Sequence, residues 1–269
     1  MRERVVLKWG GGLITEKSRL KTVRTDVLDS LAEQLSEVLA EGVDVVLVHG
    51  AGSFGHLKAK QYRLAEGRLD DALFDGEHTQ LEAVGEVRND MVELNDHVMK
   101  ALTTYDISAV SLAPHTWATN TGPEFGGDVA VFGAAPQGIV MVTHGDVVDC
   151  TDERAFGILS GDDLVVRLAT EVQGVTRVVF AMGGVEGVLA QPPKDGEEQM
   201  LLPTLGRNEA FSGEHASDLD VTGGIGLKVD RGFMVLESGI EVLLVSGEHV
   251  GRVRSACLGR EVRGTRLVP

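Results

Sequence analysis

The sequence predicts an α/β fold built around a mostly parallel sheet. Two observations carry this prediction. Short apolar strands alternate with amphipathic helices along the chain, which is the order found where parallel strands are joined through helices. The stretch Val43–His49 is also an apolar run, as expected of a strand that is buried on both faces of such a sheet.

The first elements follow in the order strand, glycine loop, helix, strand, glycine loop. Arg4–Lys8 is a short apolar strand. Asp26–Glu41 carries apolar residues at helical spacing, and Gly42 ends this helix. The strand Val43–His49 then leads into the second glycine loop.

The alternation continues along the rest of the chain. A long helix carries apolar positions from Leu81 to Leu102, and Ser160 with Asp163 predicts the N-cap and acidic first turn of another helix. The other predicted elements are strands at Ile107–Leu112, Gly138–Thr143, Arg177–Ala181 and Ile240–Ser246 and a helix from about Ile225 to Leu236. Segments 67–78, 118–138 and 191–217 are predicted to be irregular, and a boundary between two lobes is expected in the turn region 150–157.

Composition excludes several classes of partner. The 269 residues carry a formal net charge of −16, which disfavours nucleic acid and anionic membranes, since both require a positive surface. No apolar run approaches the ~20 residues that span a bilayer, and the N-terminal MRERVVLKWGGG has no signal-peptide core, so a cytoplasmic location is expected. Cys150 and Cys257 show no metal-site or C-x-x-C spacing, which favours neither a disulfide scaffold nor a zinc site.

Two glycine loops resemble nucleotide-binding motifs but fail the tests for them. Gly50–Gly55 is a literal G-x-G-x-x-G after a strand. A dinucleotide site also needs an acidic residue about 20 positions further on, at the end of the next strand, and Asp70 and Asp71 lie in a stretch that is not a strand. Gly10–Ser18 ends in Lys-Ser, but Glu16 stands where a Walker P-loop needs Gly.

The glycine loops are nonetheless suited to phosphate. Glycine has no Cβ, so its backbone amides can approach anionic oxygens closely, and a following helix adds its positive N-terminal end. Two more such loops stand at 160–163 and 220–224, and five of the eight lysines fall in the first sixty residues. Several oxyanion sites joined by lysines predict phosphoryl transfer between two phosphate-bearing molecules.

Five motifs follow one another across residues 8–228: KWGGGLITEK, HGAGSFGH, HGDVV, FGILSGDDL and DVTGGIGLK. In this combination the chain resembles the amino-acid kinase superfamily, and the closing His56 of the second motif makes it most similar to the isopentenyl phosphate kinases. The resemblance implies a three-layer, carbamate kinase-like sandwich with two lobes, residues 1–155 for acceptor binding and dimerisation and residues 156–269 for ATP binding. It further implies a homodimer that uses ATP and Mg²⁺ to phosphorylate isopentenyl phosphate to the diphosphate.

The resemblance also implies a role for each matching residue. The implied catalytic residues are Lys8, Lys17, Asp162, Lys228 and His56, with Asp162 organising the lysines. The implied ATP-binding residues are Lys8, Gly10, Gly11, Gly12, Gly223, Gly224 and Lys228. The implied acceptor-binding residues are Ala51, Gly52, Gly55, His56, Ser160 and Gly161. Because the acceptor phosphate is already ionised, His56 is expected to orient it as a hydrogen-bond donor; no residue is expected to be a metal ligand.

Two positions depart from the family pattern. Gly12 stands where the family has Ser, and Gly183–Gly187 replaces T-D-V-D-G, with Gly184 and Glu186 in place of the two Asp residues. These changes bear on nucleotide affinity and preference. They leave two alternatives open: a kinase for another small phosphate or phosphonate, like the fosfomycin kinases, and a non-catalytic nucleotide-binding module. The retained lysines favour a kinase.

The remaining candidate residues have simpler interpretations. Histidines other than His56, including His49 and His144, are expected to be ordinary exposed side chains, and Lys58 and Lys60 are expected to be solvated helix residues. Asp163 is expected to belong to a helix cap. The candidate lining of a pocket for the isoprenoid tail is Phe74, Val84, Val87 and Met91, although helical periodicity equally allows these residues to form core.

Overall fold

The computed structural model describes residues 2–16, 19–70, 74, 79–192, 200–212 and 224–269. In this part of the chain the strands are β1 (Arg4–Trp9), β2 (Asp44–His49), β3 (Ala109–Ser111), β4 (Val140–His144), β5 (Asp146–Asp149), β6 (Phe156–Leu159), β7 (Val175–Met182), β8 (Thr204–Gly206), β9 (Glu241–Ser246) and β10 (Thr265–Val268). The α-helices are α1 (Gly11–Ile14), α2 (Thr25–Ala40), α3 (Gly52–Gln61), α4 (Gln80–Thr104), α5 (Ala130–Ala134), α6 (Gly161–Glu171), α7 (Gly224–Leu236) and α8 (Arg252–Cys257).

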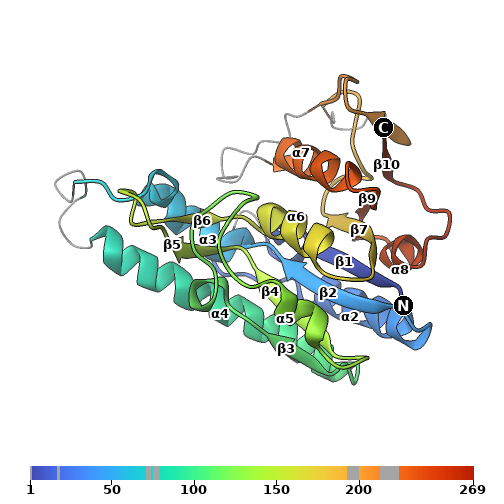
Figure 1. The fold of residues 1–269 in the computed structure, drawn as a ribbon, viewed down its shortest axis with the longest axis horizontal. Helices are drawn as coiled ribbons and strands as arrows, with labels where there is room; N and C mark the ends of the chain where they lie inside the picture. Colours follow the sequence, from blue (N-terminus) through green and yellow to red (C-terminus); the bar gives the residue numbers. More distant parts are fainter. Residues whose placement is uncertain (1, 17–18, 71–73, 75–78, 193–199, 213–223) are drawn as a thin grey trace.

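The centre of the molecule is an eight-stranded sheet in the order β3-β4-β2-β1-β7-β9-β10-β8, with helices on both faces (Figure 1). Neighbouring strands pair in parallel, except β9 and β10, which are antiparallel. The predicted α/β sandwich around a mostly parallel sheet is therefore confirmed. One continuous sheet runs through both predicted lobes, and the division at residue 155 stays a prediction.

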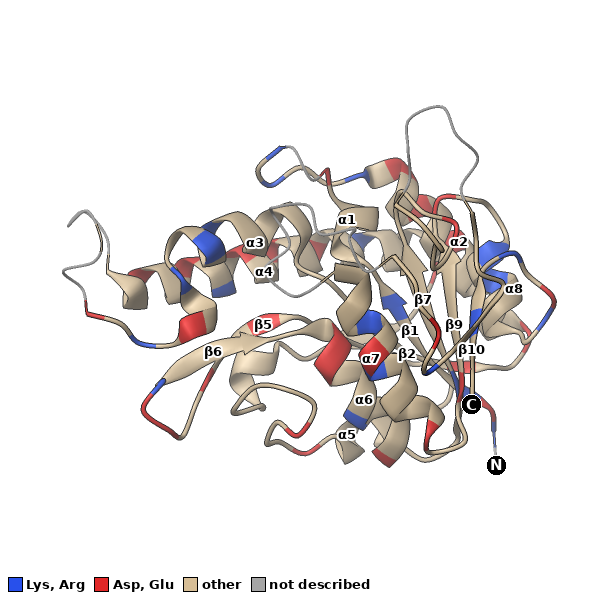
Figure 2. Ribbon diagram, turned by 90° about the horizontal axis from the view of Figure 1, so that it is seen from above, with Lys and Arg blue, Asp and Glu red and all other residues tan. Residues whose placement is uncertain are grey.

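Helix α4 is the long helix that the apolar spacing predicts. It begins after Thr79, whose side chain forms a reciprocal capping box with Glu82. One face of the helix is buried through residues such as Val87 and Leu94, and Figure 2 shows acidic residues spaced along the helix. Among the described residues no helix is both long and apolar enough to cross a membrane.

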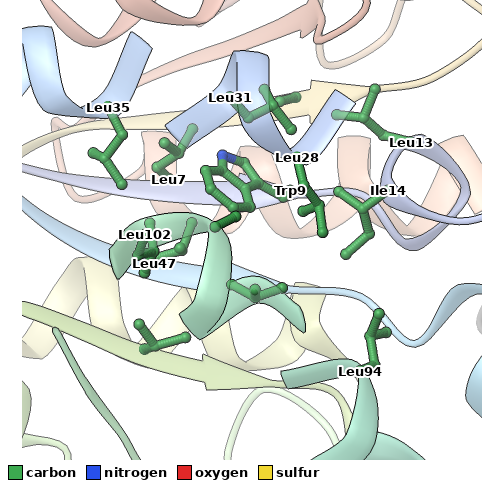
Figure 3. Packing of buried hydrophobic residues seen from close by; sticks show 14 of the residues in the cluster. Leu7, Trp9, Leu13, Ile14, Leu28, Leu31, Leu35, Leu47, Leu94 and Leu102 are labelled. Atoms are coloured by element: carbon green, nitrogen blue, oxygen red, sulfur yellow. The ribbon is translucent and has the colours of Figure 1, made fainter. Parts of the chain in front are cut away.

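Alternate residues of the central strands face opposite layers, as the pleat of a strand requires. Leu7 and Trp9 of β1 belong to one core together with Leu31 of α2 and Leu102 of α4 (Figure 3). Val6, which precedes Leu7 in the strand, belongs to the second core, which contains apolar residues of α6 and α7. Both faces of the sheet are thus covered, and the arrangement has the three predicted layers.

The structure contains several elements that the sequence pattern did not predict. β5 and β6 form an antiparallel hairpin in the region where the lobe boundary is expected. β8 lies inside the segment 191–217 that is predicted to be irregular, and α8 and β10 follow the last predicted strand. The predicted strand at Ile107–Leu112 is reduced to β3. These pieces are too short to show a hydrophobic period.

The prediction that His49 and His144 are ordinary exposed side chains is wrong. They end the neighbouring strands β2 and β4 in register, both are buried, and their ring centroids lie 4.9 Å apart. Burial lowers the pKa of His49 to about 3, with a smaller contribution from the charge of His144, and burial also lowers the pKa of His144. Residue type favoured exposure, but position at the end of two central strands decides burial.

Candidate active site

The glycine turns meet at one edge of the sheet. Gly10, Gly50 and Gly145 directly follow the parallel strands β1, β2 and β4. The strand pairing continues into the turns, since the N–H of Gly10 donates to the carbonyl oxygen of Ala181 at 2.9 Å and the N–H of Gly50 donates to that of Trp9 at 2.9 Å. Because parallel strands present their carboxyl ends at one edge, the turns lie side by side there.

Glycine is required where these turns touch. A Cβ on Gly11 would lie 2.2 Å from the backbone nitrogen of Gly52, and a Cβ on Gly183 would lie 2.8 Å from the carbonyl oxygen of Gly12. Gly52 has a φ of +51° and leaves no room for a side chain beside Thr15. The backbones of the turns after β1, β2 and β7 are therefore in direct contact.

The turns surround a cleft with a volume of about 330 Å³, a size suited to a small ligand. The predicted site residues that line it are Lys8, Gly10, Gly11, Gly12, Ala51, Gly55, His56, Ser160, Gly161, Asp162, Gly224 and Lys228. Part of its apolar lining, called the apolar wall below, is formed by Ala59, Val87, Met91, Val147 and Ile158, and further apolar lining comes from Leu13, Leu159, Met182, Val185 and Ile225. The cleft thus combines backbone amides, positive charge and an apolar surface.

Two lysines share one carboxylate in the cleft. Lys8 of β1 forms an ion pair with one oxygen of Asp162, and the Nζ of Lys228 on α7 lies 3.4 Å from the other oxygen. A Cβ on Gly161 would lie 3.1 Å from the Cε of Lys8, so glycine at this position keeps the path of the lysine open. Lys8 and Asp162 are 4% and 1% exposed, which makes this cluster the floor of the cleft.

Asp162 stays ionised in these surroundings. Burial by itself raises the pKa of its carboxyl, but the ammonium groups of Lys228 and Lys8 outweigh burial, and the pKa lies below its ordinary value of 3.8. Two positive charges around one negative charge leave the cluster with a net positive charge. The floor of the cleft therefore attracts anions, although the protein as a whole is strongly acidic.

The beginning of α6 holds Asp162 in place. Ser160 is the N-cap, and its Oγ accepts hydrogen bonds from the backbone N–H groups of Asp162 at 2.9 Å and Asp163 at 3.3 Å. Both carboxylates lie in the first turn, where the positive end of the helix dipole stabilises negative charge. Asp163 belongs to the capped turn, as the sequence predicts.

The beginning of α3 carries His56. The N-cap residue Ala51 makes no side-chain cap, and the first turn contains no acidic residue. His56 lies one turn into the helix and lines the cleft together with Ala51 and Gly55. A Cβ on Gly55 would lie 3.3 Å from the Sδ of Met91, so α3 and α4 are in close contact here. An imidazole N–H at this position can donate a hydrogen bond to an anion.

Comparison with known proteins identifies the family. The family model for the amino acid kinase family matches residues 3–246. This chain belongs to the amino acid kinase family. The isopentenyl phosphate kinase of Methanothermobacter thermautotrophicus is 32% identical over 273 residues, 98% of each chain, and that of Methanocaldococcus jannaschii is 28% identical over 97% of each chain. A solved structure of isopentenyl phosphate kinase aligns with a TM-score of 0.81 and 27% identity over 98% of this chain and 100% of its own. The product complex of the Thermoplasma acidophilum enzyme aligns with a TM-score of 0.77 over the same shares and at the same identity.

The amino acid kinase motifs predicted a set of site residues, and the fold brings most of them together in the cleft. Of the described ones, only Gly52 does not line the cleft, because it turns the backbone at the contact with Gly11. Lys17 and Gly223 lie outside the described residues. For the tail pocket, Val87 and Met91 line the cleft as predicted.

Two residues of the predicted tail pocket lie elsewhere. Val84 is buried in the core between the sheet and α4 and does not line the cleft. Phe74 packs against Tyr62, with ring centroids 5.8 Å apart, and does not line the cleft either. Helical spacing placed Val84 next to the pocket, but it does not distinguish the part of a helix face that meets a cavity from the part that meets core. Phe74 precedes the helix, so no spacing supported its assignment.

The β5–β6 hairpin supplies lining that the sequence pattern missed. Asp146 and Val147 of β5 and Ile158 and Leu159 of β6 line the cleft. The carboxylate of Asp146 is fully buried and lies 2.6 Å from the Nδ1 of His115. Asp146 and Val147 belong to the motif HGDVV, so this amino acid kinase motif was the available signal, although no role was assigned to it.

The turn after β7 is held by a carboxylate from outside it, that of Glu248. Gly183, Gly184 and Val185 line the cleft, and the N–H of Gly184 donates to Glu248 at 3.0 Å. Glu186, which replaces a family Asp, forms ion pairs with Arg252, Arg263 and His249 and is not among the cleft residues. In this chain the turn therefore presents backbone to the cleft and no carboxylate.

The sequence pattern predicted that Lys58 is a solvated helix residue, whereas the structure shows its ammonium group in ion pairs. Its Nζ lies 2.7 Å from Glu86 and 3.1 Å from Asp90 on α4, where Figure 2 shows basic segments of α3 against acidic segments of α4. The side chain is 24% exposed. Lys58 thus fastens α3 to α4.

No group of three or more His, Cys, Asp or Glu side chains is placed to hold a metal ion in the described part of the chain. The two carboxylates that line the cleft, Asp146 and Asp162, are engaged by His115 and by the lysines. A Mg²⁺ ion that enters with a nucleotide commonly keeps phosphate oxygens and waters as its main ligands.

Proposed function

We propose that this protein transfers the γ-phosphoryl group of ATP to isopentenyl phosphate and forms isopentenyl diphosphate and ADP. The observation that carries the proposal is the cluster of Lys8, Asp162 and Lys228 at the floor of a cleft that has glycine amides on one side and an apolar wall on the other. Similarity to isopentenyl phosphate kinases over almost the whole chain supports the same activity.

The acceptor phosphate binds at the beginning of α3 in this proposal. The N-cap residue Ala51 supplies no side-chain cap and the first turn has no carboxylate, while the N–H of Ser53 is bound by the hydroxyl of Thr15 at 2.9 Å. The positive end of the helix favours an anion in the cleft beside Ala51, Gly55 and His56. His56 donates a hydrogen bond that orients the phosphate. No general base is required, because the attacking oxygen is already ionised.

The two lysines neutralise the charge that moves during transfer. Phosphoryl transfer depends mainly on alignment of the reactants and on stabilisation of the equatorial oxygens. Lys8 approaches from β1 and Lys228 from α7, and each ammonium is a point charge on a flexible stem that follows the phosphoryl group. Asp162 keeps the lysines together by binding one with each oxygen.

The apolar wall receives the hydrocarbon tail. Ala59, Val87, Met91, Val147 and Ile158 contribute this surface, and burial of hydrocarbon stabilises a complex by about 25 cal/mol per Å². A polar phosphate of equal charge gains nothing from this wall. The preference for a prenyl phosphate over another small phosphate follows from this difference.

The proposal also covers the division into lobes, the oligomeric state and the cellular location of the protein. Residues 1–155 form the acceptor-binding and dimerisation lobe and residues 156–269 the ATP lobe of a cytoplasmic homodimer. In support, His56 comes from the first range and Lys228 from the second. Lys17 and Gly223 contribute further phosphate contacts from outside the described residues. Light scattering of the purified protein tests the dimer.

Mg²⁺ enters as the Mg–ATP complex in this proposal. When bound, it neutralises the β- and γ-phosphate oxygens. The glycine amides of the turns after β1 and β7 and the two lysines hold the phosphates of that complex. Chelation of Mg²⁺ is expected to abolish turnover and to leave the thermal unfolding of the free protein unchanged, since the described residues provide no metal cage.

The decisive experiment is coupled ADP release with Mg–ATP and a panel of acceptors. The panel contains isopentenyl phosphate, dimethylallyl phosphate, a longer prenyl phosphate, fosfomycin, UMP and acetylglutamate. Turnover confined to the prenyl phosphates is the expected result. Turnover with fosfomycin alone would instead identify a phosphonate kinase, and ATP binding without turnover on any acceptor would identify a non-catalytic module.

A further inference from the structure

Two ion pairs join α6 to α7 in the part of the chain that the structure describes. The first, between Asp162 and Lys228, belongs to the cleft. In the second, the Nε of Arg231 donates to the Oδ1 of Asp163 at 2.7 Å. Asp162 and Asp163 are adjacent, and Lys228 and Arg231 are three residues apart on α7, so the second pair repeats the first nearly one helical turn further along.

The second pair is firmly placed. The side chains of Asp163 and Arg231 are only 7% and 21% exposed, and the backbone N–H of Asp163 is fixed by Ser160. Burial raises the pKa of Asp163, and the guanidinium of Arg231 opposes this rise. A charge-assisted bond from a planar guanidinium is directional, so it restricts how α7 slides and rotates against α6.

Lys228 is held more loosely by its own contacts. Its Nζ lies 3.4 Å from Asp162, at the long end of hydrogen-bond distances, and 3.1 Å from the carbonyl oxygen of Gly224 in its own helix. The lysine stem has four flexible carbons. The position of its ammonium group therefore depends on where α7 itself lies.

We propose that Asp163 and Arg231 are positioning residues that hold α7 where Lys228 reaches Asp162 and the transferred phosphoryl group. Neither residue lines the cleft, so each acts through Lys228 and not on substrate. The buried apolar residues of α7, Ile225, Val229 and Phe233, hold the helix against the core, but apolar contact is non-directional. The kinetic consequence of the proposal rests on the proposed kinase function.

The kinetic test compares Arg231→Gln with Arg207→Gln. Arg207 forms an ion pair with Glu237, just after α7, and its guanidinium also contacts Phe233 near the end of that helix. This control therefore removes the same charge from the end of α7 that is remote from the cleft. We expect Arg231→Gln to lower kcat by about tenfold, as small misplacements of catalytic groups do, with little change in the KM for isopentenyl phosphate. Arg231→Lys keeps the charge but not the directional guanidinium, so it is expected to restore kcat only in part, and Arg207→Gln stays near the unmodified protein.

A double-mutant cycle separates positioning from general damage. In the background of Lys228→Met, the lysine that Arg231 positions is already gone. Arg231→Gln is therefore expected to lower kcat by less than about twofold in that background. An equal loss in both backgrounds would overturn the proposal.

Crystal structures of the two Gln variants provide a criterion that is independent of the substrate. The Nζ of Lys228 is expected to leave hydrogen-bond distance of Asp162 in Arg231→Gln and to keep it in Arg207→Gln. An unchanged contact in Arg231→Gln overturns the positioning role. Absence of turnover by the unmodified protein would instead overturn the proposed function. If Arg231→Gln does not fold, Arg231→Met is judged by the same criteria, since it also removes the guanidinium but keeps an apolar stem of similar length.

Discussion

Helices α3 and α6 both begin at the cleft, yet their first turns are built in opposite ways. The first turn of α6 is capped by Ser160 and contains two carboxylates. The first turn of α3 follows Ala51, whose side chain makes no cap, and contains no acidic residue; in this turn the neutral hydroxyl of Thr15 binds the N–H of Ser53. The positive end of a helix stabilises the anion beside it. In α6 that anion is Asp162, which belongs to the chain, whereas α3 has no carboxylate of its own in this position, and the proposed function puts the acceptor phosphate there.

The largest effect on kcat is expected when the Asp162 carboxylate in the first turn of α6 is removed. Asp162→Asn removes the negative charge that Lys8 and Lys228 share, and the lysines then repel each other. We expect kcat to fall by about 10²–10³-fold, the range seen when one strong electrostatic group is removed from an active site. Steady-state kinetics measure this loss. Asp149→Asn, which removes an exposed carboxylate paired with Arg88, is the control, and an equal loss in the control would contradict a special role of Asp162.

On α3, the corresponding substitution is His56→Ala, which removes the imidazole that lines the cleft. A hydrogen bond to a charged group contributes about 1.5–3 kcal/mol, so kcat/KM for isopentenyl phosphate is expected to fall roughly 10-fold to 100-fold, mostly through KM, with the KM for ATP unchanged. His97→Ala is the matched control, because His97 is exposed on α4 and lines no part of the cleft. A rise in the KM for ATP, with no change in the KM for isopentenyl phosphate, would contradict the assignment of His56 to the acceptor phosphate.

A pH dependence is expected from His49, which ends β2 and directly precedes the turn before α3. Its pKa is lowered from 6.5 to about 3 in the folded protein, so the unfolded state binds the proton more readily. Stability is complete above pH 6.5 and falls as the pH decreases toward 3, by roughly 1.4 kcal/mol per pH unit from this group.

Urea unfolding at pH 7, 6 and 5 measures this effect. His49→Asn removes the titrating ring, so the difference in the free energy of unfolding between the unmodified protein and the variant is expected to shrink as the pH falls. His97→Asn, at an exposed position, controls for loss of a histidine. A difference that stays constant across this range would show that burial of His49 does not control the pH response.

The smallest effect is expected from Ser160→Ala, which makes the α6 turn resemble that of α3. Loss of an N-cap side chain costs about 1 kcal/mol, so a small decrease in Tm and a modest decrease in kcat are expected, the latter because Asp162 loses its anchor. Thermal unfolding and steady-state kinetics measure the two. Ser36→Ala, on an exposed part of α2, should change neither, and an unchanged kcat in Ser160→Ala would show that the cap does not hold Asp162.

The sequence could predict those parts of the site where the residue type alone explains why it is needed at that position. Gly11 and Gly161 leave space for backbone and for Lys8, and only glycine does so after a strand. Lysine placement against an acidic background was equally visible. The pairing of Lys8 with Asp162 could be predicted only from the family resemblance, because the two residues are 154 positions apart in the sequence.

The remainder depended on partners that only the fold brings together. His49 and His144 bury each other because β2 and β4 are neighbours in the sheet. Glu248 reaches Gly184 from the turn after β9, and the β5–β6 hairpin completes the cleft with residues from two short strands. The layers were predictable from periodic helices and apolar strands, whereas these contacts have no periodic signal.

The place of β1 in the sheet has a consequence for how the protein is made. This strand comes first in the sequence but lies in the middle of the sheet, between β2 and β7. During synthesis β2 follows soon after, but the other edge of β1 stays unpaired until Val175–Met182 has emerged. Pairing over such sequence distances slows folding, and an open strand edge invites association with other chains. Because Lys8 lies on β1 and Lys228 on α7, the charge cluster forms only after most of the polypeptide has left the ribosome.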